Sequence, residues 1–174
     1  MTQPEHENTG LEEAAQNLFN FAVNRDDVKA FVENLPSETK CKPAAVEYEL
    51  QLLKIIATGW SISFFLENSP HREQVAESYW KQIHGFSADL SETTGLMTGC
   101  DIDYFQVVKS RLDMYVAALR AKSQITEPAA VIGPAFAKFC GNSDDVFSVR
   151  SGSRMFMLTV ARVQGYLESI DLEQ

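Results

Sequence analysis

The chain has 174 residues, of which 15 are basic and 24 are acidic, and its formal net charge at pH 7 is −9. This length is typical of one compact domain, and a content of 45% apolar residues is too high for an acidic disordered chain. The negative charge excludes a protein that neutralises a long stretch of nucleic-acid phosphates, and it disfavours binding to an anionic membrane surface.

The N-terminal part of the chain is the most acidic. Residues 1–50 contain ten acidic and four basic side chains, and therefore carry a net charge of −6. Residues 1–9 are polar and lack the features of a signal peptide, so we expect a disordered tail and a cytoplasmic protein. Residues 10–174 are expected to form a single domain, with an acidic helical pair over 10–40 and a main bundle over 43–172.

Apolar residues recur with helical spacing from the start of the domain. The sequence Thr9-Gly-Leu-Glu12 has the form of a capping box and predicts a first helix over about 10–23. Asp26 or Asp27 can cap a short second helix, which has Phe31 and Leu35 among its apolar core positions and which Pro36 terminates.

The third predicted helix is apolar on nearly every face. It begins at Pro43, which suits the first turn of a helix, and continues to Glu67. Its most apolar stretch, residues 50–66, is interrupted by polar side chains and is shorter than the roughly 20 residues that a membrane span needs. We therefore expect this helix to lie at the centre of a bundle.

Two amphipathic helices are predicted next. The first is capped by the sequence Asn68-Ser69-Pro70 and stops at Gly95. The second opens at Asp101 and ends near Lys122, so that its acidic and basic ends match the helix dipole.

The C-terminal third of the chain predicts a short helical segment and a long last helix. The short segment starts at Thr126-Glu127-Pro128 and ends at Gly141, and Gly133-Pro134 is expected to disturb it as either a kink or a break. Ser143 or Asp144 then caps the last helix, in which Gly152 is either a kink or a close-packing point. The fold class is therefore an all-α, single-domain bundle of about six or seven helices with a central, all-round apolar helix.

One candidate ligand site is an internal pocket near Trp60. Trp60 lies in a small and hydroxylated stretch, Thr58–Ser63, and Phe64, Trp80 and His84 are the other candidate lining residues. The alternative is that Gly59 and Ser63, four residues apart, only allow a neighbouring helix to approach closely. His84 also shares a helix face with Glu77, which suits an oriented general base, although a solvated helix face has the same pattern.

A second candidate site is the sequence Arg150-Ser-Gly-Ser-Arg154. Two guanidinium groups around a Gly/Ser turn could bind a phosphate through side chains and backbone N–H groups. The alternative is that Arg150 and Arg154 pair with the acidic N-terminal region.

The sequence contains no motif for a metal, a cofactor or a catalytic nucleophile. Cys41, Cys100 and Cys140 are far apart and are expected to be free thiols. Cys100 precedes a predicted helix, but the adjacent carboxylates favour its neutral thiol, so no catalytic residue is assigned. The three histidines lack metal-binding spacing, and we expect neither a metal nor a cofactor.

These observations favour a non-enzymatic interaction or regulatory protein. The chain is rich in aromatic residues, which anchor protein interfaces, and the expected partner is another protein or a second copy of the chain. The first alternative is a small-molecule-binding bundle with its pocket near Trp60, and the second is a cofactor-independent enzyme.

Overall fold

The protein is an all-α bundle, as the sequence predicts. The computed structural model describes residues 4–170, with side chains from residue 10 onward, and contains seven helices and no strand in this range. The helices are α1 (Pro4–Val23), α2 (Asp26–Glu33), α3 (Pro43–Phe65), α4 (Arg72–Thr98), α5 (Tyr104–Ala121), α6 (Pro128–Phe139) and α7 (Val146–Ser169).

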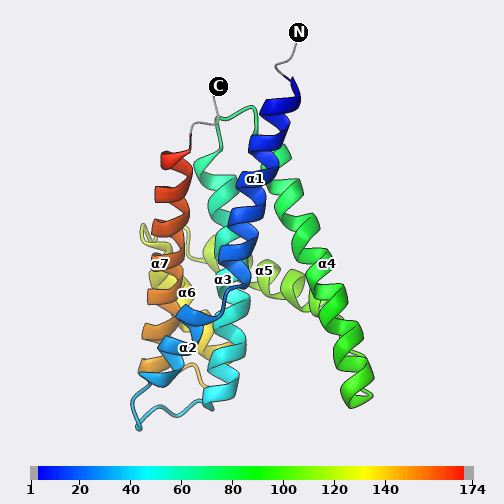
Figure 1. Ribbon diagram of the computed structural model, residues 1–174. Helices are drawn as coiled ribbons and strands as arrows, with labels where there is room; N and C mark the ends of the chain where they lie inside the picture. Colours follow the sequence, from blue (N-terminus) through cyan, green and yellow to red (C-terminus); the bar gives the residue numbers. More distant parts are fainter. Residues whose placement is uncertain (1–3, 171–174) are drawn as a thin grey trace.

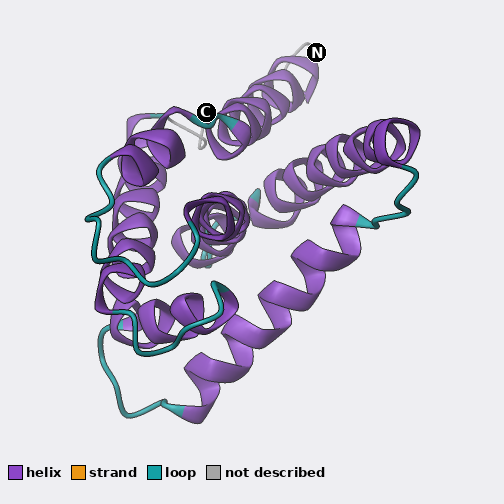
Figure 2. Cartoon of the chain, turned by 90° about the horizontal axis from the view of Figure 1, so that it is seen from below, coloured by secondary structure: helices purple, strands orange, loops and turns teal. Residues whose placement is uncertain are grey.

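Helix α3 is the centre of the bundle. It is in contact with every other helix, and Figure 2 shows it end-on with the others around it. Apolar side chains on all of its faces are buried, including Val46, Leu53 and Ile62. The prediction of a central, all-round apolar helix is therefore confirmed.

The other helices pack around α3 in two groups. On one side α1 packs against both α3 and α4, and on the other side α7 packs against α3 and α6 (Figure 1). Helix α5 crosses behind the bundle at mid-height and contacts α4 and α6. The N-terminal end of α1 and the C-terminal end of α7 lie at the same end of the molecule. None of the helices in the described part of the chain has the length and apolar character needed to cross a membrane.

Helix α1 starts earlier than its capping box predicts. It begins at Pro4, whereas a disordered tail was expected over residues 1–9, of which 1–3 lie outside the described residues. Proline suits the first turn of a helix, because its fixed φ matches the helix and its missing N–H needs no partner there. The helix therefore begins six residues before the predicted start.

The turn between α4 and α5 also differs from the prediction. Helix α4 runs past Gly95 to Thr98, and Gly99 ends it with a left-handed φ of 70°, which glycine adopts without strain. Asp103, rather than Asp101, caps α5, because its carboxylate accepts a hydrogen bond of 2.9 Å from the backbone N–H of Gln106.

Gly133-Pro134 does not break the sixth helix, which decides between the alternatives that the sequence left open. Helix α6 is continuous through both residues and packs closely against α7. A Cβ atom on Gly133 would lie 2.6 Å from the carbonyl oxygen of Val149, and one on Gly152 would lie 2.6 Å from the ring of Phe136. Both glycines are therefore close-packing points between α6 and α7, and this close packing offsets the cost of a proline inside α6.

Candidate functional site

Helix α3 buries two charged side chains that the sequence reading left unexplained. The carboxylate of Glu49 is buried and accepts two hydrogen bonds, of 2.9 and 2.7 Å, from the guanidinium of Arg111 on α5. These bonds raise the pKa of Arg111, whose guanidinium also lies 4.5 Å from the ring centroid of Phe139. Because the pair is bidentate and stacked on an aromatic ring, we interpret it as a structural link between α3 and α5.

The second buried charge is Lys54, whose side chain is 1% exposed. Its ammonium group donates to the carbonyl oxygen of Asn24 at 2.9 Å and to the carboxylate of Asp27 at 3.2 Å, and burial lowers its pKa. The same carboxylate oxygen accepts a hydrogen bond of 2.6 Å from Arg162 on α7. Burial alone would raise the pKa of Asp27, but the hydrogen bonds and charges of Arg162 and Lys54 outweigh it and hold this pKa below its usual value. Asp27 thus joins α2 to both α3 and α7.

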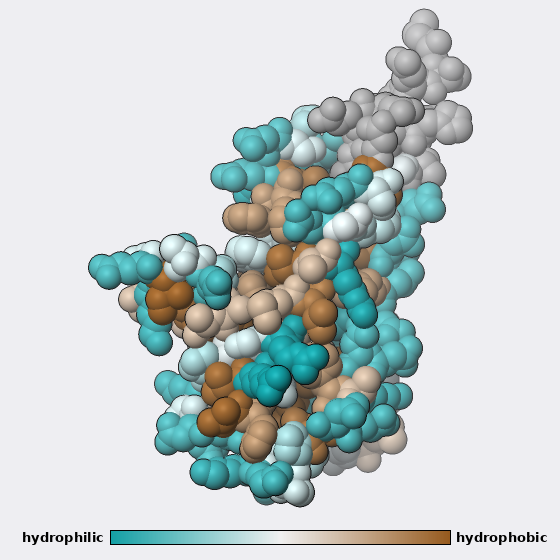
Figure 3. Space-filling view, turned by 90° about the vertical axis from the view of Figure 1, so that its left-hand side faces the viewer, coloured by the Kyte–Doolittle hydropathy of each residue, from teal (hydrophilic) through white to brown (hydrophobic). Residues whose placement is uncertain are grey.

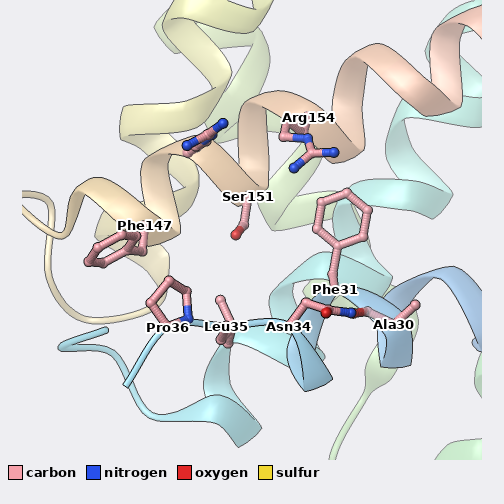
Figure 4. Close-up of a pocket in the computed structure, with 9 residues that line it drawn as sticks. Ala30, Phe31, Asn34, Leu35, Pro36, Phe147, Ser151 and Arg154 are labelled. Atoms are coloured by element: carbon pink, nitrogen blue, oxygen red, sulfur yellow. The ribbon is translucent and has the colours of Figure 1, made fainter. Parts of the chain in front are cut away.

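A groove of about 500 Å³ lies between the C-terminal half of α2 and the first half of α7 (Figure 4). On α2 and the loop that follows, it is lined by Ala30, Phe31, Asn34, Leu35 and Pro36, and on α7 by Phe147, Arg150, Ser151 and Arg154. We call this site the α2–α7 groove. Figure 3 shows the face of the molecule on which α7 lies, with apolar and strongly hydrophilic side chains side by side.

The structure brings the two predicted arginines together on one side of this groove. Arg150 and Arg154 are both exposed and lie one helical turn apart on α7. The guanidinium of Arg154 lies 5.7 Å from the ring centroid of Phe31, across the groove. Neither arginine forms an ion pair with any acidic side chain in the described part of the chain. The alternative prediction, that they pair with the acidic N-terminal region, therefore does not hold for those residues.

The predicted Gly/Ser turn between these arginines is wrong. Residues 150–154 lie inside α7, where the backbone N–H groups take part in the helix, so only side chains can contact a ligand. Ser151 is 9% exposed, and its hydroxyl points into the groove in Figure 4. No hydrogen bond joins this hydroxyl to another described residue. Three donor groups without intramolecular acceptors thus face the same space.

Comparison with known proteins adds no functional assignment. No protein-family model, curated protein or solved structure matches this chain. Its function is therefore argued from the geometry and charge of the α2–α7 groove.

The other predicted pocket, near Trp60, contains only a small cavity. Trp60 is half-buried and lines a cavity of about 20 Å³. Phe64 stacks on it, with ring centroids 4.9 Å apart, and is 54% exposed. Trp80 packs on the other side of the predicted small-residue patch, where a Cβ atom on Gly59 would lie 2.3 Å from its ring, so the close approach at Gly59 is confirmed. A cavity of 20 Å³ has room for about one water molecule.

His84 lies away from Trp60, on the exposed face of α4. Its ring meets the ring of Phe105 edge-on, with centroids 4.8 Å apart. It lines a shallow pocket of about 340 Å³ with Ser91, Asp101 and Asp103. The Asp103 carboxylate there is engaged as the cap of α5, and no hydrogen bond joins His84 to Glu77 among the described residues. An oriented His84–Glu77 pair is thus not formed.

The cysteines and candidate metal ligands are dispersed. Cys41 and Cys140 are buried free thiols, and Cys100 is an exposed one. Cys100 lies in the loop before α5 and not at a helix N-terminus, because α5 begins at Tyr104. Among the described residues, no group of three or more His, Cys, Asp or Glu side chains could hold a metal ion.

Sequence reasoning identified only the α7 side of the groove. The opposite side consists of Phe31, Leu35 and Pro36, which the sequence indicated only as core positions and a helix stop. The sequence contains one signal for this side of the groove. Pro36 terminates the helix, so the apolar Leu35 beside it lies outside the helix and can be exposed.

Proposed function

We propose that this chain is a non-enzymatic interaction protein that binds an acidic segment of a partner protein in the α2–α7 groove. The observation that carries the proposal is the pair of arginines without acidic partners, Arg150 and Arg154, beside an apolar surface. These two lie one helical turn apart and line the same groove, so their positive charges act on the same bound group. A bound acidic group would form charge-assisted hydrogen bonds with them.

The apolar residues of the groove define the rest of the ligand. Phe31, Leu35 and Phe147 are only half-buried, so their rings and methyl groups are available to side chains of a bound segment. Aromatic and arginine side chains at the centre of an interface contribute most of its binding energy. The expected partner segment therefore carries at least one acidic group flanked by apolar residues.

The alternative of a small-molecule protein with its pocket at Trp60 has less support. The cavity at Trp60 is about 20 Å³, whereas ligand pockets usually measure 300 Å³ or more. The groove is about 25 times larger and contains both charged and apolar groups.

The proposal can be tested with a peptide array and the full-length labelled chain. The array consists of 11-residue peptides with an acidic residue, Glu or phosphoserine, at the centre, with Gln in its place as the neutral control, and with randomised flanks. We expect the chain to select acidic peptides with apolar flanks. The double variant R150Q/R154Q is expected to bind these peptides at least tenfold more weakly, which corresponds to a loss of about 1.4 kcal/mol in binding free energy.

A matched control removes two positive charges elsewhere. Arg120 and Lys122 are exposed at the end of α5, so R120Q/K122Q changes the net charge equally without touching the groove. If both double variants lose affinity to the same extent, the binding reflects overall charge and the proposal fails. Failure of every acidic peptide to bind would also overturn it.

A further inference from the structure

We infer that the acidic group recognised in the α2–α7 groove is a phosphate monoester, so that the partner segment is phosphorylated. This inference rests on the proposed function and adds the chemical identity of the acid. It depends on three donor groups of α7 that share one face: the guanidinium groups of Arg150 and Arg154 and the hydroxyl of Ser151.

The positions of these groups follow from helix geometry. Residues 150, 151 and 154 lie within about 100° of one another around the axis of α7, so their side chains leave the helix on the same side. The Ser151 hydroxyl lies between the two arginines along the chain and points into the groove (Figure 4). All three residues line the groove, so a ligand bound along this part of α7 can contact each of them.

Charge and oxygen count favour a phosphate over a carboxylate. A phosphate monoester carries about −1.5 to −2 charges at pH 7 and has three terminal acceptor oxygens. It can therefore neutralise both guanidinium groups and still accept a hydrogen bond from Ser151. A carboxylate has one charge and two oxygens, and would leave one guanidinium without a counter-charge.

The position of Ser151 supports the same choice. Its hydroxyl borders the groove and makes no hydrogen bond with another described residue, even though serine in a helix often bonds to the carbonyl four residues earlier. The hydroxyl is therefore free to donate a hydrogen bond to a ligand oxygen.

The surroundings favour a phosphorylated protein segment over a membrane or free phosphate. The net charge of −9 opposes approach to an anionic membrane surface. A groove of about 500 Å³ is far larger than a phosphate ion, and the apolar side chains of Phe31, Leu35 and Phe147 would gain nothing from one.

The test compares one selected peptide in three forms that differ only at the centre: phosphoserine, Glu and Ser. Binding to the full-length chain is measured by fluorescence polarisation, with inorganic phosphate as a competitor. We expect the phosphoserine form to bind at least tenfold more tightly than the Glu form, and the Ser form to bind more weakly than both. Millimolar inorganic phosphate is expected to compete only weakly, because it lacks the apolar flanks.

Variants separate the contributions of the donors. R150Q and R154Q are each expected to bind the phosphoserine form at least tenfold more weakly. S151A is expected to bind the phosphoserine form severalfold more weakly, but to lose less than twofold in affinity for the Glu form. Circular dichroism and the unfolding midpoint of each variant verify that it is folded. R120Q/K122Q is again the charge-matched control.

The two proposals fail in different ways. If the Glu form binds as tightly as the phosphoserine form, the inference of a phosphate is overturned while the proposed acidic-segment binding stands. If inorganic phosphate binds as tightly as the phosphopeptide, a phosphorylated protein segment is also overturned. If none of the acidic forms binds, both proposals fail together.

Discussion

The two ends of α2 meet the arginines of α7 in opposite ways. At its N-terminal end, Asp27 accepts a hydrogen bond from Arg162 at 2.6 Å and also neutralises Lys54. Near its C-terminal end, α2 offers Arg150 and Arg154 only the ring of Phe31 and the amide of Asn34. The same pair of helices therefore forms a closed ionic contact at one end and an open basic groove at the other. Arg162 at the closed end has a structural role, whereas Arg150 and Arg154 at the open end are available to a ligand.

The largest expected effect is at the closed end. Substitution Asp27→Asn leaves the buried Lys54 ammonium without its counter-charge, and is expected to lower the free energy of unfolding by about 2 kcal/mol. Arg162→Gln is the matched control: the Arg162 side chain is 54% exposed, so its loss should cost less than about 1 kcal/mol. Urea unfolding measures both, and equal losses would contradict a dominant role for Lys54.

A smaller effect is expected from acid. Because the pKa of Asp27 is lowered in the folded state, its contribution to stability is complete above the unfolded pKa, near 4, and is lost as the pH falls through the folded pKa. The difference in unfolding free energy between the native chain and Asp27→Asn should be constant above about pH 5 and become smaller as the pH falls below 4. Urea titrations at several pH values measure it. A difference that stays constant down to pH 3 would contradict the assigned ion pair.

The smallest expected effect comes from closing the open end. Ala30 is exposed on α2 and lines the groove, so Ala30→Glu places a carboxylate opposite the two unpaired arginines. We expect a gain in stability of about 0.5 kcal/mol that disappears in high salt, together with weaker binding of the acidic peptides. Ala30→Gln has nearly the same size without the charge and should change neither. If Ala30→Glu leaves peptide affinity unchanged, the ligand does not use these arginines.

The sequence predicts the helices more reliably than the contacts between them. Apolar periodicity identifies all seven helices, because it is a local property of the chain. The predicted caps are less accurate, since the observed N-caps Arg25, His71, Asp103 and Asp145 each lie one or more residues from the predicted ones. Gly133-Pro134 predicts a kink or a break, because the close approach of α7 that stabilises the continuous helix depends on residues 16 to 20 positions later. Gly95 predicts a helix end, whereas the left-handed glycine that ends α4 is Gly99.

The sequence predicts only one of the two sides of the groove. Arg150 and Arg154 attract attention by their type and spacing, and the structure confirms that they lie together. Phe31 and Leu35 fit the pattern of core residues equally well, since periodicity does not distinguish an apolar side chain in the core from one at the edge of a groove. The partner of Arg162 was likewise invisible, because Asp27 lies 135 positions away in the sequence.

The two buried charges of α3 have a consequence for folding. Glu49 and Lys54 lie on the same helix, but their counter-charges come from different parts of the chain, Arg111 on α5 and Asp27 on α2. Any partly assembled bundle that lacks α2 or α5 would contain an uncompensated charge in its core, which is strongly unfavourable. Both charges of the central helix are therefore compensated only when the N-terminal helices and α5 have both docked, which favours a single cooperative unfolding transition over stepwise loss of either side.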